Sequence, residues 1–113
     1  MLKIYHNPRC SKSRAGLKYL VDNTIPHKII EYLKVLLSPE DIMDLSIKTG
    51  LKPFELVRTH EEYFKKNLKG KEFTDKEWCE IISENLRLLH RPIVVNGNNA
   101  VLAQPPENIN NIL

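Results

Sequence analysis

The chain has 113 residues, of which 42% are hydrophobic and 27% charged, and its formal net charge is +3. This composition is typical of one soluble globular domain, and the small basic excess lacks the clustered Lys and Arg of a nucleic-acid-binding protein. No apolar run is long enough to cross a membrane, and the first residues lack the apolar core of a signal peptide. We therefore expect a cytoplasmic protein that binds neither nucleic acid nor membrane.

The first part of the chain predicts a strand, a helix and a second strand. Residues 3–5 follow an apolar alternation, residues 11–23 have the apolar content of a helix, and residues 27–32 form the second strand pattern. A strand–helix–strand unit of this length makes its two strands parallel through a right-handed crossover.

The middle of the chain, from Ser38 to Leu89, shows helical patterns and no strand pattern. A helix start at Ser38-Pro39-Glu40 and a stop at Gly50 delimit the first helix. A capping-box pattern at Thr74–Glu77 begins the last one. The predicted helical segments are 38–50, 53–57, 61–67 and 74–89.

The end of the chain returns to a strand pattern. Residues 92–95 form a strand, Asn96-Gly97-Asn98-Asn99 is a hairpin-turn signal, and residues 100–103 form the returning strand. A short helix is expected from Pro105 to the end of the chain.

This order of elements predicts an α/β, thioredoxin-like fold with a four-stranded mixed sheet flanked by helices. Residues 1–113 form one domain in this interpretation. Residues 1–33 and 90–113 make the core, and residues of about 38–89 form a helical insertion subdomain. The chain shows no exposed apolar pattern that demands a dimer, so a monomer is expected.

Cys10 stands where the first strand meets the first helix. Backbone N–H groups at a helix N-terminus lack partners and attract negative charge, so a thiolate there is stabilised and nucleophilic. Ser11 and Ser13 can donate hydroxyl hydrogen bonds to the sulfur or to a bound oxyanion, or can act as helix caps. Ser13 also occupies the place of the second cysteine of a Cys-x-x-Cys pair, so the thiol that resolves an adduct on Cys10 must come from outside this loop.

Three further residues are candidates for this site. His6 ends the first strand and can stabilise the thiolate as an imidazolium or move a proton as neutral imidazole. Arg58 and Arg91 can bind a tetrahedral oxyanion with their planar guanidinium groups. We also predict a cis Arg91–Pro92 bond, because Arg91 opens the third strand beside the nucleophile in this fold.

The second cysteine, Cys79, has the spacing of a buried helix face with Ile82, Leu86 and Leu89, so a structural role is expected. The histidines stand singly, and no Cys/His spacing matches a zinc site. The chain is therefore expected to hold no metal and no bound cofactor.

The segments "YHNPRCSKSR", "ELVRT" and "HRPIVV" together resemble the ArsC-type arsenate reductase family, and the resemblance covers essentially the whole chain. It implies an oxidoreductase in which Cys10 attacks arsenate, with His6 and Ser13 supporting the thiolate and Arg58 and Arg91 binding the oxyanion. Glutathione, glutaredoxin or a thioredoxin-like protein would supply the electrons. Gln104, in "VLAQPPE", stands where such reductases place a third arginine, and it offers the anion hydrogen bonds without a charge.

Two alternatives remain open. Spx-type transcription regulators belong to the same superfamily, so the chain can instead be a non-catalytic protein that binds RNA polymerase or another partner. Those regulators often carry a Cys-x-x-Cys switch at this loop, whereas this chain has Cys-x-x-Ser. The third interpretation is a monothiol redoxin that acts on oxidised or glutathionylated thiols.

Overall fold

The computed structural model describes all 113 residues and divides the chain into two compact units. The first unit combines Met1–Val35 with Arg91–Leu113, and the second is Leu36–His90.

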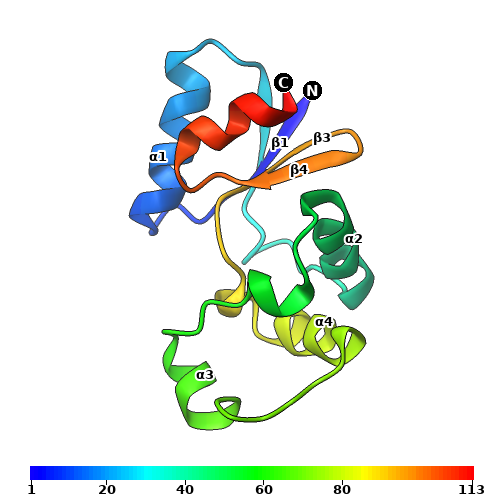
Figure 1. Cartoon of the computed structure of the whole chain (residues 1–113). Helices are drawn as coiled ribbons and strands as arrows, with labels where there is room; N and C mark the ends of the chain where they lie inside the picture. The colour runs from blue at the N-terminus through cyan, green and yellow to red at the C-terminus, as the bar shows by residue number, and fades with distance from the viewer. The chain divides into compact units, whose positions relative to one another are not determined.

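A four-stranded mixed sheet forms the centre of the first unit (Figure 1). Its strands are β1 (Leu2–Tyr5), β2 (His27–Ile30), β3 (Ile93–Asn96) and β4 (Asn99–Leu102), in the order β2-β1-β3-β4. β1 runs parallel to β2 and antiparallel to β3, and β3 and β4 form an antiparallel hairpin. The predicted thioredoxin-like α/β fold is therefore confirmed.

Two helices cover the same face of this sheet. α1 (Ser11–Asp22) crosses over from β1 to β2, and the 3-10 helix η3 (Pro106–Ile112) ends the chain beside it (Figure 1). The core between the helices and the sheet contains Ile4 of β1, Leu20 of α1 and Ile109 of η3, all fully buried. Each such side chain contributes about 1.5–3 kcal/mol through burial, so this core fixes α1 against the sheet.

The β3–β4 hairpin turns within the predicted segment 96–99, through a two-residue loop of Gly97 and Asn98. Asn96 pairs with Asn99, and Gly97 has φ of 62°. A positive φ at the first loop position is the requirement of a type II′ turn, which glycine meets without steric cost. The turn fixes the register that brings Ala103, the first residue beyond β4, back alongside the start of β3.

The second unit is helical. Its elements are α2 (Pro39–Thr49), η1 (Pro53–Leu56), α3 (Glu62–Asn67), α4 (Asp75–Glu84) and η2 (Leu86–Leu88). α2 and α4 each begin with a complete capping box, and α2 ends at Gly50 in the left-handed conformation, as predicted. Aromatic rings gather around Trp78 of α4, where they contact its indole: Phe54, Phe64 and Phe73.

Two predicted elements end earlier than expected. The helix predicted over 74–89 stops at Glu84, because Asn85 leaves the helical conformation (φ −139°) and its side-chain amide donates to the carbonyl of Ile81. The second strand ends at Ile30 instead of Tyr32, and a turn closed by the Lys34 N–H and the Glu31 carbonyl follows it.

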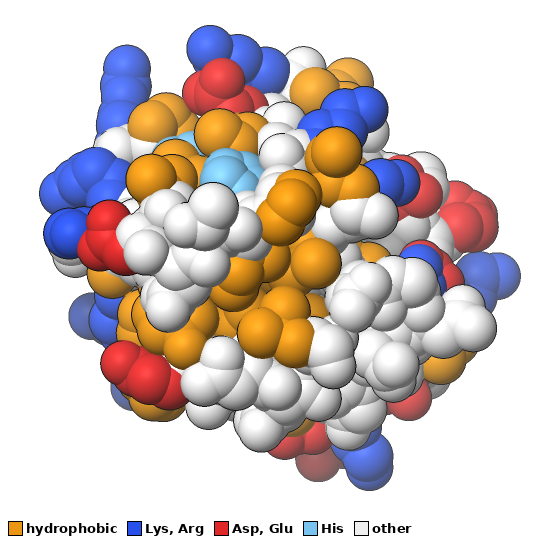
Figure 2. Space-filling view, turned by 90° about the horizontal axis from the view of Figure 1, so that it is seen from above, with side chains coloured by type: hydrophobic (Ala, Val, Ile, Leu, Met, Phe, Trp, Pro, Cys, Tyr) orange, Lys and Arg blue, Asp and Glu red, His pale blue; other side chains and the backbone are white.

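Positive and negative side chains are mixed on one face of the molecule (Figure 2). On the face drawn in Figure 2, Lys and Arg side chains are interspersed with Asp and Glu and do not gather into one patch. None of the helices combines the length and the apolar character needed to cross a bilayer.

Candidate active site

The loop between β1 and α1 is organised by Asn7. The Asn7 carbonyl accepts a hydrogen bond from the Cys10 N–H (3.0 Å), and the Asn7 side-chain oxygen accepts one from the Arg9 N–H (3.0 Å). Asparagine commonly closes such turns through its own side chain. The result is that Cys10 occupies the N-cap position of α1.

The Cys10 thiol is half-buried and faces hydrogen-bond donors from two elements. Burial by itself raises the pKa of Cys10, because it disfavours the thiolate. Hydrogen bonds from the Ser13 N–H and the Arg91 side chain lower the pKa, as does one from the Lys12 N–H. With the added charge of Arg91, the donors outweigh burial and hold the pKa of Cys10 below its ordinary value.

Ser13 contributes to the site through two different groups. Its backbone N–H faces the Cys10 sulfur, whereas its hydroxyl lies 2.6 Å from Nδ1 of His6 and accepts a hydrogen bond from the Asn7 N–H (2.9 Å). Ser13 has no exposed surface. Of the roles that the sequence left open for its hydroxyl, the structure therefore shows neither a helix cap nor a bond to the sulfur, because His6 and Asn7 occupy it.

His6 is buried, and its surroundings favour the neutral form of the imidazole. Burial lowers the pKa of His6, and the positive charge of Arg14 acts in the same direction. The charge of Glu31 and a hydrogen bond with the Ser13 backbone raise the pKa of His6, but burial is the larger effect and the net pKa is below the usual value. Of the two states that the sequence allowed, the structure favours neutral imidazole, whose Nδ1 lies against the Ser13 hydroxyl.

Arg91 reaches Cys10 from the loop just before β3. It is 92% buried, since only 8% of its surface is exposed, and the Arg91–Pro92 peptide bond is cis, as predicted. α1 passes close to Pro92 at Gly16, where a Cβ would lie 2.5 Å from the Pro92 Cγ. The absence of a side chain at Gly16 is therefore what allows α1, and Cys10 with it, to approach this loop.

Gln104 lies two residues beyond β4 and contacts both α1 and the segment before β3. Its side-chain nitrogen donates to the Arg91 carbonyl (2.5 Å), and its side-chain oxygen accepts from the Lys12 ammonium (3.5 Å). The Gln104–Pro105 bond is also cis, for which the sequence carries no signal. The Gln104 amide is thus already bonded to protein atoms, whereas we expected it to contact the oxyanion directly.

The two remaining predicted site residues are Ser11 and Arg58. Ser11 is exposed at the first position of α1, next to Cys10. Arg58 belongs to the second unit, where its guanidinium contacts Glu61 (3.2 Å), the Arg87 carbonyl (3.4 Å) and His60 (3.0 Å). The structure therefore brings Cys10, His6, Ser13, Arg91 and Gln104 together in the first unit.

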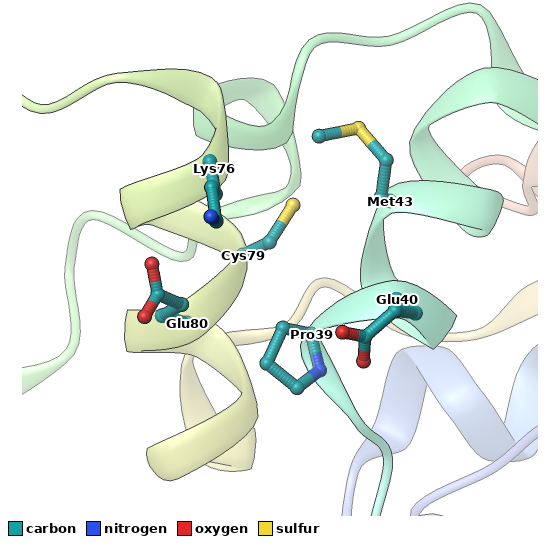
Figure 3. A pocket seen from close by; sticks show the side chains of 6 residues that line it. All are labelled: Pro39, Glu40, Met43, Lys76, Cys79 and Glu80. Carbon is teal, nitrogen blue, oxygen red and sulfur yellow. The ribbon is translucent and has the colours of Figure 1, made fainter.

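Cys79, the second cysteine, differs from Cys10 in every respect that governs reactivity. It is 2% exposed, and burial together with the charges of Asp75 and Glu80 raises its pKa. Its sulfur points toward Met43 across a cavity of about 280 Å³ between α2 and α4 (Figure 3). The predicted burial of Cys79 is confirmed, and this thiol is poorly ionised.

Four contributors to the site were missed in the sequence. Asn7 was treated only as part of a turn signal, and the roles of the Lys12 N–H, of Gly16 and of Glu31 were not anticipated. An Asn-Pro pair just before a helix start was a usable signal for Asn7. The other three depend on contacts between segments distant in sequence, or on backbone orientation, and carry no local signal.

The fold and this site define a thioredoxin-like protein with a single activated cysteine at a helix N-terminus and an arginine against it. Residues 5–112 match the model of the ArsC family. The chain belongs to this family.

Similar proteins share nearly the full length of the chain. An arsenate reductase of Haemophilus influenzae is 38% identical over 112 residues, which cover 97% of both chains. An uncharacterized protein of Escherichia coli is 34% identical over 110 residues, covering 96% of this chain and 92% of its own. The solved structure of an arsenate reductase from Vibrio cholerae superposes with a TM-score of 0.93 at 36% identity, covering 99% of this chain and 97% of its own. These similarities favour the enzyme over the regulator and the redoxin.

Proposed function

We propose that this protein is a thiol-dependent arsenate reductase in which Cys10 is the nucleophile. The observation that carries the proposal is the set of donors around the Cys10 sulfur: two backbone N–H groups of α1 and the Arg91 side chain. The same groups that stabilise a thiolate also attract an oxyanion to its side. Relatives that match almost the whole chain are arsenate reductases, which supports arsenate as that oxyanion.

The first step is attack of the Cys10 thiolate on the arsenic of dihydrogen arsenate. A sulfur–arsenic bond forms, and one arsenate oxygen takes up a proton and leaves as water. A thiolate of an external reductant then attacks the Cys10 sulfur, forming a mixed disulfide. The electron pair of the sulfur–arsenic bond stays with arsenic, which leaves as arsenite, reduced from the +5 to the +3 state. A second external thiol then reduces the mixed disulfide and returns Cys10 to its starting form.

The reductant must come from outside the chain. Ser13 replaces the second cysteine that would form an internal disulfide, and Cys79 lies in the other unit with a raised pKa. We propose glutathione with a glutaredoxin, or a thioredoxin-like protein, as the donor. This cycle needs a reducing compartment to regenerate the thiol, which supports the cytoplasm as its location. A monomer carries all the residues that the proposal uses.

Arg91 and Arg58 have separate roles in the proposal. Arg91 stabilises both the thiolate and the negative charge of the bound arsenate. Arg58 is proposed as a second cation for the oxyanion, because it stands in the "ELVRT" segment that resembles the family's motif. His6 holds the Ser13 side chain, and so the first turn of α1, in the orientation that Cys10 requires.

The test is arsenate-dependent oxidation of glutathione in the presence of a glutaredoxin. The parent protein should turn over, Cys10→Ser should lose turnover completely, and the matched control Cys79→Ser should keep it. Activity that survives Cys10→Ser would contradict the mechanism. The absence of turnover in the parent with both glutaredoxin and thioredoxin as donors would contradict the choice of arsenate as substrate.

A further inference from the structure

We propose that Gln104 is a positioning residue: its side-chain amide holds the Arg91 carbonyl and thereby keeps the Arg91 guanidinium against the Cys10 sulfur. This role differs from that of an oxyanion ligand, because Gln104 acts here through Arg91. It deepens the proposed function and rests on Cys10 being the reactive thiol.

The two contacts of Gln104 define how its amide is oriented. The Lys12 ammonium can only donate hydrogen bonds, so the group that faces it at 3.5 Å must be the Gln104 oxygen. The Arg91 carbonyl can only accept, so the group 2.5 Å from it must be the Gln104 nitrogen. Both neighbours require the same orientation, and Gln104 therefore links the first turn of α1 to the Arg91 backbone.

Gln104 is itself fixed from several sides, which allows it to hold another segment in place. Its backbone N–H donates to the Leu102 carbonyl (2.9 Å), and its own carbonyl accepts from the Asn108 side chain (3.2 Å). The preceding residue, Ala103, donates its N–H to the Pro92 carbonyl (2.9 Å). The Gln104 side chain adds a second bond across the same junction, one residue closer to Arg91.

The position of Arg91 matters because its interaction with Cys10 depends on direction and distance. A charge-assisted hydrogen bond weakens steeply when its angle departs from linearity. The carbonyl held by Gln104 belongs to the same residue as the guanidinium. Loss of that bond lets the Arg91 backbone rotate, and the side chain then spends less time at the sulfur.

The experiment measures the alkylation rate of Cys10 against pH in a Cys79→Ser background, in five proteins. These are the parent, Gln104→Met, Gln104→Ala, Gln104→Arg and Asn110→Ala. Methionine matches glutamine in size but cannot donate to the Arg91 carbonyl, whereas arginine can. Asn110→Ala is the matched control, because it removes an amide from η3 whose hydrogen-bond partner is the Tyr19 hydroxyl and not Gln104 or Arg91.

We expect Gln104→Met to raise the midpoint of the Cys10 alkylation profile by roughly half a pH unit to one pH unit. This is a part of the shift that complete loss of a charged donor would produce. Gln104→Arg should keep the parent midpoint or lower it, and Asn110→Ala should leave it unchanged. Gln104→Ala, which removes the side chain beyond Cβ, should match Gln104→Met and guards against an effect peculiar to methionine.

An unchanged midpoint in both Gln104→Met and Gln104→Ala would overturn the positioning role, and so would an equal rise in Asn110→Ala. Because alkylation needs no arsenate, this outcome is independent of turnover. A shifted midpoint in a protein that does not reduce arsenate would support the positioning role and contradict the proposed substrate. A parent midpoint at or above that of a free thiol would instead remove the premise that Cys10 is activated.

Discussion

Gly16→Ala tests the packing that brings Cys10 next to the Arg91–Pro92 segment. Gly16 is a buried residue of α1, and a Cβ built on it would lie 2.5 Å from the Pro92 Cγ and 3.8 Å from the Ile4 Cδ1. Carbon atoms at van der Waals contact are ~3.5–4.0 Å apart. The new methyl group therefore overlaps the proline ring by about 1 Å, and the helix or the loop must move.

Two energies of opposite sign decide the effect on stability. Replacing a helix-interior glycine by alanine stabilises the helix by about 1 kcal/mol. Inserting a methyl group into a packed core costs about 1–3 kcal/mol. The clash involves a ring carbon, which has no flexible end to swing aside, so we expect the upper part of that range. The predicted net change is a loss of about 1–2 kcal/mol in the free energy of unfolding.

Urea unfolding measures this change, and the alkylation rate of Cys10 against pH measures its effect on the site. Ala15→Gly, at the exposed neighbouring position of α1, is the matched control for helix propensity and should lose about 1 kcal/mol. Displacement of the loop moves Arg91 away from the sulfur, so the Cys10 midpoint should rise in Gly16→Ala and stay constant in Ala15→Gly. Stabilisation of Gly16→Ala by about 1 kcal/mol with an unchanged Cys10 midpoint would refute the close-packing argument.

Three further outcomes are expected. Ser13→Ala leaves the buried Asn7 N–H without its hydroxyl acceptor and should lower the unfolding free energy by about 1–3 kcal/mol in urea; an unchanged value would show that the hydroxyl is dispensable. Arg58→Lys removes the bidentate fork and should raise the KM for arsenate about tenfold while leaving the alkylation midpoint of Cys10 unchanged; an unaltered KM would exclude Arg58 from the anion site. Cys79 should alkylate only above the pH at which a free thiol ionises, because its raised pKa keeps it protonated; modification at neutral pH would contradict its burial.

The fold was largely predictable because its signals are local. Capping boxes, Gly50 and the Gly97 turn each fix a backbone conformation within a few residues, and the order of strands and helices then selects the topology. The position of Cys10 follows from the same logic, since a helix that begins at Ser11 makes the preceding residue its N-cap.

The helix boundary that was predicted wrongly depends on contacts that hydrophobic periodicity does not reveal. The spacing of Ile82, Leu86 and Leu89 suggested one continuous helix, but Asn85 ends the helix at a position where the apolar pattern continues. Burial of Leu86 and Leu89 follows from a 3-10 turn and the segment after it. Hydrophobic periodicity indicates which residues are buried, but it does not distinguish one continuous α-helix from a shorter α-helix followed by a 3-10 turn.

Within the site, the contacts of Gln104 could likewise not be predicted from the sequence. Its place before Pro105 identified the segment, but the partners of its amide are Lys12 and Arg91, which lie far away in sequence. The role of the Ser13 hydroxyl was likewise open until the structure placed it against His6 and Asn7. Side chains that act through a neighbour can be assigned only when that neighbour is known.

The central claim is that the first turn of α1 and Arg91 hold Cys10 as a thiolate. The alkylation rate of Cys10 against pH in the Cys79→Ser protein measures this directly, because only the thiolate reacts. The account predicts a single ionisation with a midpoint clearly below the value of about 8.5 for a free thiol. A midpoint at or above that value would contradict it.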